Sequence, residues 1–170
     1  SDFRYEVARV SHRDISSWWQ QITIRKGHNY DVHPGAPVVF TGGVVGRVRE
    51  VHAYTSVVDL VSSPRVRLAG QFEKDSRPVS YQGVANPPIL PPIGRVEFVS
   101  SDVEGIPNES LKLVSSGLGG VFPAGLRIGD VEVLSSNPDG LFKTGRVKLD
   151  SRLNTITEVA ILISLDPVAP

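Results

Sequence analysis

The sequence predicts an all-β protein built from many short strands. Its 16 glycines and 13 prolines are spread along 170 residues, and both residue types interrupt long regular elements. No window of about 12 residues keeps the apolar stripe of an amphipathic helix. Short runs instead alternate apolar and polar side chains, as Ile22 and Ile24 alternate with Thr23 and Arg25. This alternation is typical of strands with one buried face.

Near the start, residues 11–21 are predicted to form a short helix or an irregular turn. Asp14 precedes the apolar Ile15 and is a candidate to cap a helix over residues 15–20. After this segment we expect about ten strands, at the spacing typical of β-barrels. The predicted strands are 22–25, 37–41, 44–51, 56–61, 65–68, 95–98, 110–114, 131–135, 147–149 and 156–165.

A short recurrence supports several of these strands. Glycine followed by a charged residue and valine occurs at Gly46, Gly94, Gly129 and Gly145. We interpret each as the beginning of a strand, because glycine permits a tight entry and valine begins the buried face. Chance repetition in a chain rich in glycine and valine is the alternative.

Two segments interrupt the strands and are predicted to be loops. Residues 101–108 contain two acidic residues with Gly105 and Pro107, and residues 86–92 contain four prolines. The proline-rich segment is either a semi-rigid crossing between two sub-barrels or a long bend within one.

Composition excludes several classes of function. Eighteen basic residues balance 18 acidic residues, so no excess positive charge attracts nucleic acid or an anionic membrane. The absence of cysteine excludes disulfides and thiol chemistry. No apolar run reaches the roughly 20 residues that cross a bilayer, and the N-terminus lacks a signal-peptide pattern. Because the sequence has no Met, we expect a processed chain or a fragment whose membrane anchor lies upstream.

Two ordered blocks of motifs carry a family resemblance. The first lies between Trp18 and Pro64 and contains ITIRKG at 22–27, PGAPVV at 34–39 and GGVVGRV at 42–48. The second, at 115–131, reads SSGLGGVFPAGLRIGDV. Together with the apolar run at 159–165, these blocks resemble the MreC family of rod shape-determining proteins. Asp31 and the pair Asn108–Glu109 depart from the family's pattern, which indicates a divergent member.

The resemblance implies two small six-stranded β-barrels, arranged like the halves of a chymotrypsin-type protease but without a catalytic triad. In the family these barrels follow a coiled coil and one membrane-spanning helix. We assign residues 1–68 to the first barrel, with the strand at 156–165 as a candidate to complete it. Residues 69–155 are assigned to the second barrel.

The resemblance also implies a non-enzymatic scaffold that needs no cofactor and maintains rod cell shape. Such a protein lies on the periplasmic side of the inner membrane and self-associates into filaments or sheets. Its implied partners are MreD and the elongation-specific penicillin-binding transpeptidase, with the actin-like MreB acting across the membrane.

The residues themselves give little support to catalysis or metal binding. A chymotrypsin-type nucleophile lies in a Gly-Asp-Ser-Gly context, whereas Ser116 follows another serine. His28 and His33 lie on either side of an evident turn, with Asp31 between them. No further zinc ligand is supported beside these two imidazoles and one carboxylate, so a turn is the preferred interpretation. A barrel hydrolase remains an alternative, with Ser116 and a histidine and an aspartate from His12, His28, His33, His52, Asp14, Asp31, Asp59 and Asp102.

The glycine-rich segment 117–120 is the first candidate contact surface. It precedes no helix and has no Lys-Ser or Lys-Thr pair, so it is not a phosphate-binding loop. One interpretation is a turn that Leu118, Val121 and Phe122 seat against the barrel, with Pro123 stiffening the exit. The other is that Leu118 and Phe122 are exposed and bind a partner.

Two further features are candidate binding positions. Trp18 and Trp19 are adjacent, so one is expected in the core and the other is a candidate for packing against another chain or stacking on sugar. The second use would make the protein a carbohydrate- or peptidoglycan-binding β-module. The arginine pairs 47/49 and 65/67 each place two cations on one strand face, either solvated or against an acidic partner.

Overall fold

The computed structural model describes residues 2–16, 19–85, 87 and 90–166. Within them every regular element is a strand or a short 3-10 helix, so the predicted all-β class is confirmed. The strands are β1 (Phe3–Asp14), β2 (Gln21–Ile24), β3 (Pro37–Phe40), β4 (Gly43–Val51), β5 (Ser56–Leu60), β6 (Arg67–Phe72), β7 (Asp75–Ala85), β8 (Ile93–Ser100), β9 (Leu111–Ser115), β10 (Arg127–Ser136), β11 (Phe142–Lys148) and β12 (Glu158–Ser164), with 3-10 helices η1 (His28–Tyr30) and η2 (Ser151–Asn154).

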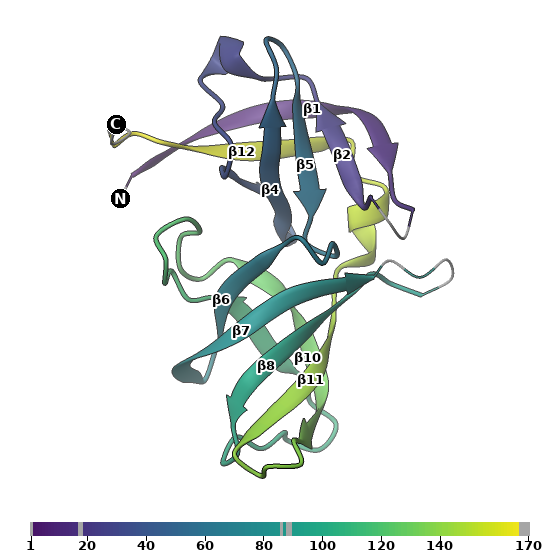
Figure 1. Ribbon diagram of the computed structural model, residues 1–170, viewed down its shortest axis with the longest axis vertical. Helices are drawn as coiled ribbons and strands as arrows, with labels where there is room; N and C mark the ends of the chain where they lie inside the picture. The colour runs from purple at the N-terminus through teal and green to yellow at the C-terminus, as the bar shows by residue number, and fades with distance from the viewer. Residues whose placement is uncertain (1, 17–18, 86, 88–89, 167–170) are drawn as a thin grey trace.

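These strands form two closed antiparallel barrels of six strands each, as predicted. The first has the order β1-β12-β3-β4-β5-β2 and the second β10-β11-β8-β7-β6-β9. Figure 1 shows the barrels one above the other, with the two chain ends side by side on the first. After β11 the chain leaves the second barrel and returns to the first, where β12 pairs with β1 and Leu162 lies opposite Tyr5. The arrangement is compatible with that of a chymotrypsin-type protease.

Alternating apolar residues fill both barrels. In β2, Ile22 and Ile24 are buried while Gln21 and Thr23 are only partly covered, as the sequence pattern predicts. Each such side chain contributes about 1.5 to 3 kcal/mol when removed from water. The buried apolar residues extend through both barrels as one cluster.

Two long strands, β1 and β7, were not predicted. In β1, Ala8 is the one residue with little exposure, and Tyr5 and Val7 face solvent, so the strand lacks an apolar face. The segment 11–21, expected as a short helix or an irregular turn, is strand as far as Asp14, where β1 ends; the Asp14 carboxylate then accepts the Ser16 N–H at 3.1 Å. Residues 17–18 lie outside the described residues. β7 contains Pro78 and Gly83, two residue types that weaken a strand pattern.

The glycine recurrence was misread as a set of strand beginnings. Gly46, Gly94, Gly129 and Gly145 all lie inside strands, after the first residue. A Cβ on Gly46 would lie 1.9 Å from the Asp59 carbonyl oxygen. These glycines are therefore required by close approach of neighbouring atoms.

Direct contacts fix the junction between the barrels. A Cβ on Gly43 at the start of β4 would lie 2.1 Å from the Arg127 carbonyl oxygen on β10. Asp150 pairs with Arg152 at 2.7 Å and with Arg127 at 3.5 Å. The buried Tyr81 hydroxyl donates a hydrogen bond to the Val61 carbonyl at 2.6 Å. These contacts hold the two barrels in a fixed arrangement at the junction.

Candidate functional site

The glycine-rich loop joins β9 to β10 and is closed at its base by Ser115. The buried Ser115 hydroxyl donates to the Pro123 carbonyl at 2.6 Å and accepts the Leu126 N–H at 2.9 Å. The Ser115 carbonyl accepts the Gly125 N–H at 2.8 Å. These bonds give the ends of the loop a fixed geometry without covering its tip.

The tip requires glycine for its backbone conformation. Gly119 and Gly120 have φ values of +86° and +73°, and no neighbouring atom lies within 4 Å of a Cβ placed on either residue. Positive φ at open positions shows that the torsion angles, and not packing, explain the glycines here. The loop therefore projects from the second barrel.

The two interpretations of the loop apply to different residues. Phe122 is 6% exposed and belongs to the core cluster, so it anchors the loop. Leu118 is 60% exposed and presents an apolar side chain to solvent. Val121 is half-buried against the cluster and Pro123 is also half-buried. Phe122 is therefore buried as an anchor of the loop, and Leu118 is the loop's candidate contact residue.

A groove lies between this loop and the first barrel. Gly120 and Val121 line one side, and the segment 33–37 and the ends of β1 and β12 line the other. In Figure 1 the β9–β10 loop (green) lies next to the first barrel on the side of the chain ends. The groove combines apolar residues with the charged Arg4 and Asp31. The sequence analysis missed it, because residues far apart in the chain form its two walls.

The two tryptophans cannot be compared directly, since Trp18 lies outside the described residues. Trp19 is 45% exposed, and the Arg65 guanidinium lies over its ring at 5.0 Å from the centroid. Trp19 is therefore the candidate for the exposed tryptophan that the sequence predicts. Its partner is a cation from the segment between β5 and β6.

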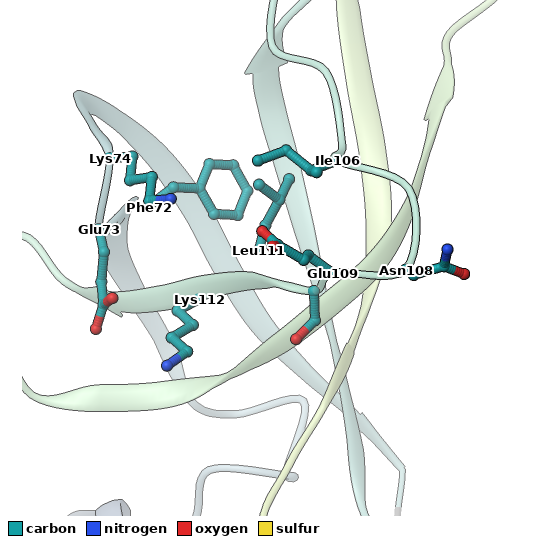
Figure 2. A pocket seen from close by; sticks show the side chains of 9 residues that line it. Phe72, Glu73, Lys74, Ile106, Asn108, Glu109, Leu111 and Lys112 are labelled. Atoms are coloured by element: carbon teal, nitrogen blue, oxygen red, sulfur yellow. The ribbon is translucent and has the colours of Figure 1, made fainter.

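A second hollow lies at the opposite end of the second barrel. Figure 2 shows the side chains of Phe72, Ile106 and Leu111 close together, with charged residues around them. Phe72 is 3% exposed and serves the core. The rim carries two glutamates and two lysines, Glu73, Glu109, Lys74 and Lys112. Because these charges balance, the hollow indicates no particular ligand class.

The residues considered for catalysis are not assembled into a triad. The Ser116 hydroxyl accepts the Leu118 N–H at 3.2 Å, and no hydrogen bond joins it to a histidine within the part of the chain that the structure describes. The four histidines belong to segments of the first barrel, whereas Ser116 belongs to the second. His52 instead lies 3.5 Å from Glu50. The geometry gives the hydrolase alternative no support.

The described residues also offer no metal site and no membrane-spanning helix. They contain no group of three or more His, Asp or Glu side chains placed to hold a metal ion. The turn at His28 instead uses Asp31 in the left-handed conformation, with φ of +60°. No helix among these residues has the length and apolarity needed to cross a membrane.

Comparison with known proteins gives one consistent family. The model of the family "Rod shape-determining protein MreC, barrel core" matches residues 10–163. The cell shape-determining protein MreC of Listeria monocytogenes is 28% identical over 165 residues, which cover 91% of this chain and 52% of that protein. The chain thus spans about half the length of the curated relatives it matches.

Solved structures agree with the sequence match. MreC from Pseudomonas aeruginosa has a TM-score of 0.81 at 27% identity, over 93% of this chain and 98% of that one. A complex between penicillin-binding protein PBP2 and MreC from Helicobacter pylori also matches, with a TM-score of 0.69 over 96% of this chain and 99% of the matched one. At 12% identity that likeness shows the fold alone.

Proposed function

This chain belongs to the MreC family of rod shape-determining proteins, and we propose that it is a non-enzymatic scaffold of the complex that elongates the bacterial cell wall. In this role the chain holds wall-synthesis proteins in place, because its barrels and loops bind partner proteins and a further copy of the chain. Because a ligand shifts a conformational equilibrium by its differential affinity, scaffold binding would favour the active arrangement of the synthase.

The observation that carries this proposal is the match of both barrels to the family's barrel core. The exposed Leu118 supports it, because an exposed apolar side chain on a loop with a fixed base can be buried in a pocket of a protein partner. We propose the elongation-specific penicillin-binding transpeptidase as a direct partner. A solved MreC–PBP2 complex from a related fold supports this choice.

The remaining partners and the location belong to the same proposal. We place the chain on the periplasmic side of the inner membrane, anchored through an N-terminal segment outside this sequence. MreD is proposed as a membrane partner and MreB as a partner across the membrane. Their support is membership of the family, whose curated relatives are about twice as long as this chain.

We propose two structural units as the basis of this scaffold. Residues 1–66 with 156–165 contain β1 to β5 and β12, and residues 67–155 contain β6 to β11. This boundary lies two residues before the one expected from the sequence, because β6 begins at Arg67.

The test is binding of the chain to the immobilised transpeptidase domain, measured by biolayer interferometry. We expect saturable binding that Leu118→Ser weakens about tenfold, since one buried apolar anchor is worth about 1 to 2 kcal/mol. Leu141→Ser is the matched control, because Leu141 is 65% exposed and lies in the turn between β10 and β11, not in the β9–β10 loop. Absence of binding, or equal weakening by both substitutions, would contradict the proposal for this loop.

A further inference from the structure

Three arginines lie together on the outer face of the first barrel. Arg47 and Arg49 belong to β4, and Arg65 follows β5. They line a hollow of about 330 Å³ together with Pro34, Gly35, Val48, Asp59 and Val66. In the sequence these arginines stand out only as pairs within a strand, and the scaffold role does not use them.

One carboxylate lies among these cations. The buried Asp59 carboxylate is 3.1 Å from Arg49 Nε and 3.9 Å from Arg65 Nη1. Its burial raises the pKa of Asp59, against the lowering effect of Arg49 and Arg65. Glu50 on β4 lies 3.5 Å from His52, and its negative charge also acts on Asp59, where it raises the pKa. Three guanidinium groups against these two carboxylates still leave an excess of positive charge around the hollow.

Each guanidinium has a partner that fixes its position. Arg47 Nε donates to the Gly35 carbonyl at 3.3 Å, and Arg49 Nη2 donates to the Gln21 amide oxygen at 2.5 Å. Arg65 stacks on the Trp19 ring. A guanidinium has five N–H donors, so these contacts leave donors free to bind an anion. Ordering the cations in advance lowers the entropy lost on binding.

The surroundings of the arginines distinguish between kinds of anionic ligand. Trp19 is 45% exposed although Arg65 lies over its ring, so it adds exposed aromatic surface beside the cations, which suits contact with a sugar ring. Asp59 and Gly35 also line the hollow; their oxygens already accept from Arg49 and Arg47, and each carboxylate or carbonyl oxygen has a second lone pair that suits a hydroxyl group. An acidic peptide segment would need the cations but neither the ring nor the acceptors.

We propose that Arg47, Arg49, Arg65 and Trp19 form a binding site for an anionic carbohydrate, a sugar that carries a phosphate or carboxylate group. The guanidinium groups bind the anion through charge-assisted hydrogen bonds, and Trp19 contacts the sugar. This site is on the first barrel and is separate from Leu118, so it goes beyond the scaffold role and does not depend on it.

The test is an NMR titration of the full 170-residue chain, following the arginine Nε–Hε signals and the backbone amides. The probes are glucose 6-phosphate, glucuronate, neutral glucose and a glutamate-rich peptide. We expect saturable shifts of the Arg47, Arg49 and Arg65 signals with one or both sugar anions. Whichever of glucose 6-phosphate and glucuronate binds with the lower Kd then identifies phosphate or carboxylate as the preferred group.

Substitutions assign the effect to this site. Arg47→Gln is expected to weaken binding of the sugar anion about tenfold, as loss of one charge-assisted hydrogen bond does. It leaves the pairing of Asp59 with Arg49 in place, so the amide spectrum should otherwise be unchanged. Arg95→Gln is the matched control, since Arg95 is an exposed β8 arginine paired with Glu97 at 2.9 Å.

Four results would overturn the proposal: no saturable shift with either sugar anion, equal shifts with neutral glucose, shifts with the glutamate-rich peptide alone, or equal weakening by Arg47→Gln and Arg95→Gln. The transpeptidase measurement above is independent of all four. Failure of the carbohydrate site and failure of the scaffold role are therefore distinguishable.

Discussion

The turn at Gly42 and Gly43 and the loop at Gly119 and Gly120 are both built on paired glycines, but their surroundings are opposite. A Cβ on Gly42 would lie 2.4 Å from the Phe40 ring, and one on Gly43 would lie 2.1 Å from the Arg127 carbonyl oxygen. At Gly119 and Gly120 no atom lies within 4 Å. Gly43 of the first pair lets the two barrels approach each other, whereas the second pair shapes a loop that remains exposed.

The tightly packed barrel junction and the exposed β9–β10 loop therefore have different roles. The barrel junction has glycine contacts, the Asp150 ion pairs and the buried Tyr81 hydrogen bond. The loop has a fixed base and an exposed Leu118. A rigid support that displays an apolar tip is suited to binding proteins without large rearrangement. Substitutions on the two sides should therefore have different effects on stability.

Gly43→Ala is expected to have the largest effect. It adds a Cβ against a backbone carbonyl at a position whose φ is +124°. Strain and overpacking together should lower the free energy of unfolding by roughly 3 kcal/mol, measured by urea denaturation. Gly105→Ala is the control, because Gly105 has open space around it. Equal stability of the two variants would show that the barrels are not in close contact at Gly43.

Tyr81→Phe tests the same junction with a smaller change. It removes the hydroxyl that donates to the Val61 carbonyl at 2.6 Å and leaves that buried acceptor without this partner. We expect a loss of about 2 kcal/mol in the free energy of unfolding. Tyr54→Phe, at a residue that is 71% exposed, should change little. A loss no larger than that of the control would mean that this hydrogen bond contributes nothing.

On the loop side, Gly119→Ala should cost about 1 kcal/mol, the strain of a left-handed alanine. The same denaturation measurement checks it, with Gly119→Asn as a milder variant because asparagine tolerates positive φ better. A loss as large as that of Gly43→Ala would indicate that the loop is packed and not displayed.

Asp150→Asn should have the smallest effect at neutral pH and a distinctive pH dependence. The hydrogen bond from Arg152 holds the pKa of Asp150 below its ordinary value of 3.8. The folded state therefore binds this proton less tightly than the unfolded chain, so the stabilisation is present above about pH 4 and is lost as pH falls through the lower folded value. The difference in unfolding free energy between wild type and variant should shrink below pH 4. A constant difference would contradict the pairing.

The alternating pattern was sufficient to predict strands such as β2 and β4, and the family resemblance supplied the two-barrel arrangement. It was not sufficient for β1, because Tyr5 and Val7 face solvent on a strand whose role is pairing with β12. The pattern also could not show that Gly46 lies against the Asp59 carbonyl, since that contact depends on the register in which β4 and β5 pair.

The candidate site was predictable only in part. The segment 115–131 was recognised from its glycines, but its periodicity does not distinguish the exposed Leu118 from the buried Phe122. That difference depends on how Ser115 closes the loop through Pro123 and Leu126. The arginine cluster was seen as pairs within a strand, because only the fold brings Arg65 next to Asp59 and Trp19.

The most direct test of the account is sedimentation velocity of the chain over a concentration series, with Leu118→Ser and Leu141→Ser measured in parallel. If the displayed loop of a rigid scaffold mediates self-assembly, the wild type and Leu141→Ser should form larger species as concentration rises, and Leu118→Ser should remain smaller. A sharp monomer at every concentration, or the same growth in all three proteins, would contradict the claim that this loop is the contact surface.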